Sequence, residues 1–248
     1  MKILIVSGFL GAGKTTFIKR LARNVDQRFA ILENEYGAAG IDGARLGQNR
    51  QGTQKNVWEM TEQCICCIGK KDFAASVLTI ANVVDPEYLI VEPTGVGSLA
   101  RIIENLRQIE YERIQLLSPV TIVDVYSYRR YMAEYPELYQ DQIRSADTII
   151  VSKTEACQAE EKQRIQKFLQ EINSQAKIIT DYASTMTRED YQSLLLGSRY
   201  EKKVQDTQSG EKMPETFSFE NIRMEAPETL WCFLEQIIRE AFGNIIRA

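Results

Sequence analysis

A glycine-rich segment near the start of the chain has the residue types and spacing that phosphate chemistry needs. It reads Gly8-Phe9-Leu10-Gly11-Ala12-Gly13-Lys14-Thr15-Thr16 and follows an apolar run at residues 3–6. Glycines let backbone N–H groups turn inward around phosphate oxygens, and the helix expected over residues 16–25 adds the positive end of its dipole. The pattern G-x-x-x-x-G-K-T predicts a triphosphate site in which Lys14 reaches the β- and γ-phosphates and the Thr15 hydroxyl binds Mg²⁺. The residues predicted to bind the nucleotide here are Gly8, Gly11, Ala12, Gly13, Lys14, Thr15 and Thr16.

Three cysteines, Cys64, Cys66 and Cys67, fall within four positions and form a candidate thiolate site. Zinc and similar ions accept sulfur ligands at about 2.3 Å, and carboxylates can complete an open coordination set. Glu33 and Glu35 follow a predicted strand beside the expected phosphate site and supply such carboxylates. The chain contains no histidine, so a metal ligand has to be Cys, Asp, Glu, backbone or water. A redox thiol pair and buried structural cysteines remain as alternatives.

Glu92 ends another apolar run and is followed by Pro93, Thr94 and Gly95. An acid at this position of a P-loop protein orients Mg²⁺ or its water, so we predict a catalytic role for Glu92 beside Lys14. Gly95 is predicted to bring a backbone N–H to the γ-phosphate. The alternative is a surface acid before a Pro-Thr-Gly turn.

A candidate base-reading loop, Ser152-Lys153-Thr154-Glu155, follows a later apolar run. Lys153 can lay its methylene stem over a base, and Glu155 can accept hydrogen bonds from the N1–H and N2–H₂ groups of guanine. Ser152, Lys153 and Glu155 are therefore predicted to bind the nucleotide, with guanine favoured. The alternative is a plain loop in which Ser152 or Thr154 caps the next helix. No role is assigned to Asp124 or Asp181.

These motifs need a scaffold, and the hydrophobic pattern predicts an α/β fold. Strand-like runs alternate with helical patterns, which indicates a mostly parallel sheet with helices on both faces. Ligands of such folds gather at the carboxyl ends of the strands, where every motif above lies. The predicted strands are residues 3–6, 29–32, 88–91, 120–125, 148–151 and 177–180.

The pattern also predicts a division of the chain. Residues 1–196 form the nucleotide-binding domain, and the polar stretch 197–213 reads as a linker. Residues 214–248 are predicted to open a partial α+β domain, with a strand at 216–219 and an amphipathic helix at 226–241, that is cut short.

Composition excludes several classes of function. The chain is 44% hydrophobic and 26% charged, which is typical of a soluble domain with a buried core, and its net charge of −4 argues against nucleic acid as a partner. Its apolar runs are too short to span a bilayer, and its first residues enter the glycine-rich loop without a cleavage site. A cytoplasmic protein without a membrane partner is expected.

Taken together, segments 8–16, 33–37, 64–67, 92–95 and 152–155 resemble the CobW family of P-loop GTPases, relatives of HypB and UreG. Their order and spacing match the family over residues 1 to about 196. The resemblance implies a P-loop NTPase fold and a metal chaperone or insertase, with some members tied to cobalamin. Ser152 and Glu155 depart from the usual Asn and Asp of the base-reading motif, and Ala38 stands where some relatives carry another acidic ligand.

The sequence thus predicts a slow GTPase that uses GTP and Mg²⁺ and binds Zn²⁺, or Co²⁺ or Ni²⁺, for delivery to a client metalloprotein. Two alternatives remain: a small-molecule kinase using the same loop, and a regulatory GTPase that senses thiol oxidation or metal. The metal, the client and a nucleotide-dependent homodimer are left open.

Overall fold

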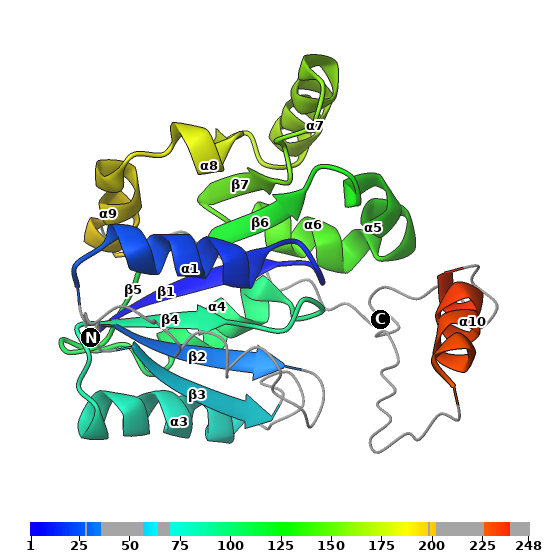
Figure 1. Cartoon of the computed structure of the whole chain (residues 1–248). Helices are drawn as coiled ribbons and strands as arrows, with labels where there is room; N and C mark the ends of the chain where they lie inside the picture. Colours follow the sequence, from blue (N-terminus) through cyan, green and yellow to red (C-terminus); the bar gives the residue numbers. More distant parts are fainter. Residues whose placement is uncertain (28, 36–56, 64–69, 198, 202–225, 239–248) are drawn as a thin grey trace. The chain divides into compact units, whose positions relative to one another are not determined.

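The computed structural model describes the whole chain except residues 28, 36–56, 64–69, 198, 202–225 and 239–248 (Figure 1). The chain divides into two compact units, Met1–Pro214 and Glu215–Ala248. In the second unit the described part contains helix α10 (Pro227–Ile238), within the helix predicted at 226–241. The strand predicted at 216–219 lies outside the described residues.

The first unit is built on one parallel sheet, and the fold class predicted from the sequence is confirmed. Within the described residues, eight strands pair in the order β3-β2-β4-β1-β6-β7-β8, with β5 beside β1. Each of the six predicted runs coincides with a strand, and none extends more than one residue past the end of that strand. The strands are β1 (Lys2–Gly8), β2 (Phe29–Glu35), β3 (Val57–Gln63), β4 (Tyr88–Glu92), β5 (Gln115–Leu116), β6 (Val120–Asp124), β7 (Thr148–Ser152) and β8 (Lys177–Ile179).

Strands β3 and β5 were missed by the sequence analysis. β3 pairs with β2 along its whole length at the end of the strand order. Its sequence, VWEMTEQ, lacks the continuous apolar run that marks strands buried on both faces. β5 has two residues, too few to give a periodic signal.

Helices cover both faces of the sheet because its strands alternate between two apolar cores. In β1, Ile3 and Ile5 belong to a core that includes α3 and α4, whereas Leu4 and Val6 belong to one that includes α1 and α9. Figure 1 shows α1 and α3 on opposite sides of the strands. The helices of this unit are α1 (Lys14–Asn24), α3 (Lys70–Val83), α4 (Leu99–Arg107), α5 (Tyr128–Glu134), α6 (Pro136–Arg144), α7 (Ala159–Ile172), α8 (Tyr182–Thr185) and α9 (Arg188–Leu196).

The first unit continues past the predicted domain end at residue 196. Arg199 forms a β-bridge with Leu117, and Tyr200 is 3% exposed within the core that also holds Leu116. Residues 202–213 of the predicted linker lie outside the described part. Among the helices that the structure describes, none is long and apolar enough to cross a membrane.

Candidate functional site

The sheet brings three of the sequence motifs to one edge. β1 lies between β4 and β6, and β7 lies beside β6. All these pairings are parallel, so the carboxyl ends of the strands share an edge. Gly8, Glu92, Asp124 and Ser152 are the last residues of these four strands.

The loop between β1 and α1 has the backbone shape of a phosphate cradle. Its glycines all have positive φ, with 144° at Gly8, 69° at Gly11 and 99° at Gly13, a region that L side chains rarely adopt. Gly13 is the N-cap of α1, and no side chain caps this helix. The first N–H groups of α1 are therefore available to an anion, which the helix dipole also favours.

Lys14 folds back over this loop. Its Nζ donates hydrogen bonds to the carbonyl oxygens of Gly8, at 3.0 Å, and Phe9, at 3.4 Å, and the residue is 8% exposed. The loop thus holds one buried ammonium group at its centre. Such a group can exchange carbonyl oxygens for phosphate oxygens without leaving the loop.

Thr15 and Glu92 meet at the start of α1. The Thr15 hydroxyl donates to Oε1 of Glu92 over 2.9 Å, and Glu92 is 9% exposed. A hydroxyl and a carboxylate side by side are the hard oxygen donors that Mg²⁺ prefers. These residues fit the cation predicted from the sequence.

Gly95 packs directly against the phosphate loop. A Cβ added at Gly95 would lie 2.4 Å from the backbone nitrogen of Leu10 and 2.8 Å from its Cα. No side chain fits in this contact, so a residue other than glycine would push the two loops apart. The segment after Glu92 and the phosphate loop are therefore in close contact at Gly95 and Leu10.

The predicted base-reading loop is attached to the phosphate loop and to β6. The Ser152 hydroxyl donates to the carbonyl oxygen of Ala12 over 2.6 Å. Lys153, in the left-handed region with φ 59°, donates from Nζ to Oδ2 of Asp124 over 2.6 Å. The Glu155 side chain is exposed. Asp124, which received no role from the sequence, thus orients Lys153; its place at the end of a strand on the same edge was the signal that could have found it.

Asp181, the other acid without an assigned role, is the N-cap residue of α8 and supports the same loop. It accepts hydrogen bonds from Lys162, at 2.6 Å, and from Thr154. These bonds lower the pKa of Asp181 below its ordinary value, and the bond from Lys162 has the largest effect. An ionised Asp181 therefore holds Thr154, the central residue of the loop.

The predicted transition-metal ligands are described only in part. Cys64, Cys66 and Cys67 lie outside the described residues, and of Glu33 and Glu35 the structure describes the backbone, in β2. The β2–β4 register pairs Glu33 with Glu92. Within the described residues, no group of three or more His, Cys, Asp or Glu side chains could hold a metal ion.

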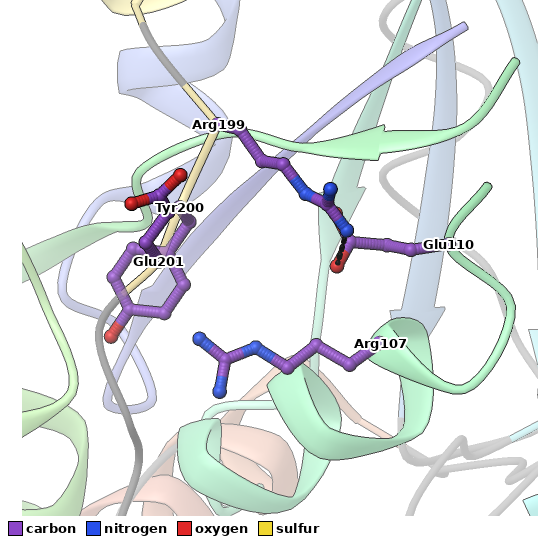
Figure 2. A pocket seen from close by; sticks show the side chains of 5 residues that line it. All are labelled: Arg107, Glu110, Arg199, Tyr200 and Glu201. Atoms are coloured by element: carbon purple, nitrogen blue, oxygen red, sulfur yellow. Dashed lines mark hydrogen bonds and ion pairs between the residues drawn. The ribbon is translucent and has the colours of Figure 1, made fainter. Parts of the chain in front are cut away.

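A separate polar hollow of about 310 Å³ lies away from this edge (Figure 2). Arg199 forms an ion pair with Glu110 at 3.3 Å, and the Arg107 guanidinium lies 5.2 Å from the centre of the Tyr200 ring. Glu110 also accepts from the backbone of Leu116 in β5, which pairs with the first residues of β1. The hollow is therefore near the amino ends of the strands. Its lining residues are Arg107, Glu110, Arg199, Tyr200 and Glu201.

Comparison with known proteins decides the family. The profile described as "CobW/HypB/UreG, nucleotide-binding domain" matches residues 2–180, most of the chain. The chain belongs to the CobW/HypB/UreG family. The match covers the phosphate loop, the Glu92–Gly95 segment and the Ser152–Glu155 loop, so these CobW/HypB/UreG features all lie within the matched domain.

Curated relatives of this CobW/HypB/UreG chain carry zinc in their names. The zinc chaperone YeiR of Escherichia coli K12 is 30% identical over 178 residues, covering 71% of this chain and 53% of that protein. The zinc chaperone CobW of Pseudomonas aeruginosa is 27% identical over 209 residues, covering 72% and 56%. The chain thus spans about half the length of the curated relatives it matches.

Solved structures from the CobW/HypB/UreG family share the fold. Zn(II)-bound YjiA GTPase from E. coli superimposes with a TM-score of 0.59 at 20% identity, covering 98% of this chain and 79% of that one. The hydrogenase maturation factor HypB from Archaeoglobus fulgidus gives a TM-score of 0.52 at 18% identity, covering 79% and 89%. At these identities the likeness supports the P-loop NTPase fold alone.

Proposed function

We propose that this chain is a GTP-hydrolysing metallochaperone in which the nucleotide state controls a site for zinc or a similar ion. The observation that carries the proposal is the bond between Thr15 and Glu92, because Glu92 lies beside Glu33 in the strand register. One carboxylate thus contacts the nucleotide loop and neighbours the start of the predicted cargo segment. The names of YeiR and CobW, both zinc chaperones, support zinc as the cargo.

Hydrolysis in this proposal depends on groups that stabilise charge on the transferred phosphoryl group. The backbone N–H groups of the glycine loop hold the phosphates, and the Lys14 ammonium moves from the carbonyls of Gly8 and Phe9 to the β- and γ-phosphates. Thr15 and Glu92 would hold Mg²⁺, which neutralises phosphate charge when bound. Glu92 would also orient the attacking water.

Guanine is the proposed base. Lys153, fixed by Asp124, offers its methylene stem as a surface for the ring, and the exposed Glu155 offers a carboxylate to the N1–H and N2–H₂ groups. Adenine presents a different arrangement of donors and leaves that carboxylate without a partner.

Cargo binding is proposed for Cys64, Cys66 and Cys67, completed by Glu33 and Glu35. Thiolates accept Zn²⁺, Co²⁺ and Ni²⁺, and availability in the cell decides among them. A movement of Glu92 on γ-phosphate loss would reach Glu33 through the neighbouring strand, which gives hydrolysis a route to the cargo. The recipient would be a client metalloprotein.

The test is zinc release measured together with phosphate release. The protein is loaded with one equivalent of zinc and mixed with GTP, a non-hydrolysable GTP analogue or GDP, while a chromophoric chelator reports free zinc. We expect phosphate release from GTP and faster zinc transfer to the chelator with GTP than with the analogue. Equal transfer rates in all three states would contradict the proposal.

Lys14→Ala separates the function from its rivals. This variant should bind GTP about 100-fold more weakly, since hydrogen bonds to charged groups contribute about 1.5–3 kcal/mol. Lys19→Ala, on the same helix, is the matched control and should hydrolyse GTP normally. ATP turnover that requires a small-molecule acceptor and ignores zinc would instead identify a kinase.

A further inference from the structure

A buried glutamine on α6 holds the segment that follows Glu92. Gln142 is 1% exposed, and its Nε2 donates to the carbonyl oxygens of Gly95, at 3.1 Å, and Gly97, at 2.9 Å. Both amide hydrogens are therefore used on one short loop. The backbone carbonyl oxygen of Gln142 accepts a hydrogen bond from the Thr121 hydroxyl of β6 over 2.9 Å, which fixes this part of α6 against the sheet.

The orientation of this side chain follows from its surroundings. The two carbonyl oxygens can only accept hydrogen bonds, so they require the NH₂ end of the amide. Oε1 of Gln142 is buried and has no hydrogen-bond partner among the described residues. A buried acceptor left in this way costs about 1–3 kcal/mol. The two hydrogen bonds from Nε2 therefore fix the position of the loop, although they leave Oε1 of Gln142 without a partner among the described residues.

The same pair of helices also grips the phosphate loop. The Tyr131 hydroxyl of α5 donates to the carbonyl oxygen of Leu10 over 3.1 Å, and its ring packs against Phe9 with centroids 4.2 Å apart. Leu10 is the residue that Gly95 touches. α5 and α6 thus hold both sides of the contact between Gly95 and the phosphate loop.

We propose that Gln142 is a positioning residue that holds Gly95 in place, so that the Gly95 N–H can recognise the γ-phosphate. Gly95 has little conformational freedom, because Gln142 holds its carbonyl oxygen and its Cα packs against Leu10. Its N–H is therefore already oriented when a triphosphate binds. The inference rests on the proposed nucleotide function of this site. It makes Gln142 a determinant of the preference for triphosphate over diphosphate and of the hydrolysis rate.

The test uses Gln142→Glu and a matched control on the same helix. Gln142→Glu keeps the size but sets a carboxylate oxygen against two carbonyl oxygens. Gln140→Glu makes the same change at a half-buried glutamine that forms hydrogen bonds with Met132 and Arg144. The glutamate keeps Oε1, which accepts the hydrogen bond from Arg144. Gln142→Met removes both donors without adding charge and serves if the glutamate variant does not fold.

Calorimetric titration with GDP and with a non-hydrolysable GTP analogue gives the first readout, and steady-state hydrolysis gives kcat and KM. In either Gln142 variant we expect the analogue to bind about tenfold more weakly, the effect of one or two lost hydrogen bonds, with GDP affinity within twofold of wild type. The kcat should fall by a similar factor, whereas Gln140→Glu behaves as wild type.

Other outcomes overturn the inference. Equal weakening of the analogue and GDP would mean that Gln142 only stabilises the fold, and unchanged binding of both would mean that Gly95 does not depend on it. If the wild type prefers ATP, the same titrations with an ATP analogue and ADP decide the role of Gln142, although the proposed GTPase function has failed. A wild type that binds no nucleotide overturns both.

Discussion

The hydroxyl of Ser152 donates a 2.6 Å hydrogen bond to the carbonyl oxygen of Ala12, which joins the base-reading loop to the phosphate loop. Ser152 is 3% exposed, and a Cβ added at Gly13, the next residue of the phosphate loop, would lie 3.9 Å from the Cβ and Oγ atoms of Ser152. The two ends of a bound nucleotide would therefore contact one connected piece of structure.

Ser152→Ala should weaken the binding of guanine nucleotides by about 3- to 10-fold, because a buried hydrogen bond contributes about 0.5–1.5 kcal/mol. GTP and GDP should lose affinity equally, since the bond lies away from the γ-phosphate contacts. Titration calorimetry with both nucleotides measures the effect. Thr187→Ala is the control: it removes the N-cap hydroxyl of α9, which costs stability but leaves nucleotide affinity unchanged. A GTP-selective loss in Ser152→Ala would contradict the assignment.

Guanine preference should depend on Glu155. In competition against a fluorescent GDP derivative, GTP should displace the probe at lower concentration than ATP. Inosine triphosphate, which keeps the N1–H and lacks the 2-amino group, should fall between them. Glu155→Ala should bring the three affinities within about threefold of one another, since the carboxylate no longer distinguishes the donors. An unchanged preference for GTP in the variant would assign base recognition to another residue.

Zinc and γ-phosphate should change each other's affinity. Zinc titrations in the GTP-analogue and GDP states should differ by at least about fivefold, the lower end of typical coupling free energies of about 1–3 kcal/mol. Glu33→Gln should reduce this ratio more than it reduces nucleotide affinity, because Glu33 neighbours Glu92 in the β2–β4 register. Glu112→Gln, at an exposed acid, is the control. Titrations that superimpose in the two states would leave a metal-binding GTPase without nucleotide gating.

Asp181 should stabilise the protein in a pH-dependent way. Its pKa is lower in the folded chain than in the unfolded one, so the stabilisation is complete where both states are ionised and is lost as the pH falls through the folded pKa. Asp181→Asn should cost about 0.5–1 kcal/mol at pH 7, the size of a partly exposed ion pair. The difference should decline as the pH falls below the ordinary pKa of 3.8 and vanish once Asp181 is protonated in both states. Urea denaturation across this range measures it.

A double-mutant cycle with Lys162→Met checks the cause. The hydrogen bond from Lys162 is the largest cause of the lowered pKa of Asp181. The losses of stability in Asp181→Asn and Lys162→Met should therefore not be additive. Additive losses, or a difference that persists in acid where Asp181 is protonated in both states, would attribute the effect of Asp181 to another contact.

The sequence alone determined the local features of this protein. The spacing of Gly8, Gly13, Lys14 and Thr15 predicts the phosphate loop, because the shape of this loop depends on residues that are adjacent in the sequence. The apolar runs of the central strands predict a sheet that is buried on both faces. Ligands of parallel α/β folds gather at the carboxyl ends of the strands, which is why Glu92 and Ser152 were predicted beside the phosphate loop.

Tertiary structure decided the contacts between residues that are far apart in the sequence. Ser152 and Ala12 are separated by 140 positions, Gln142 and Gly95 by 47, and Lys153 and Asp124 by 29. A buried glutamine or a strand-end aspartate has no periodic signal, because its partner is chosen by how helices and strands pack and not by its neighbours in the chain. The phosphate loop was therefore readable from the sequence, whereas the contacts that hold it in place became visible only in the fold.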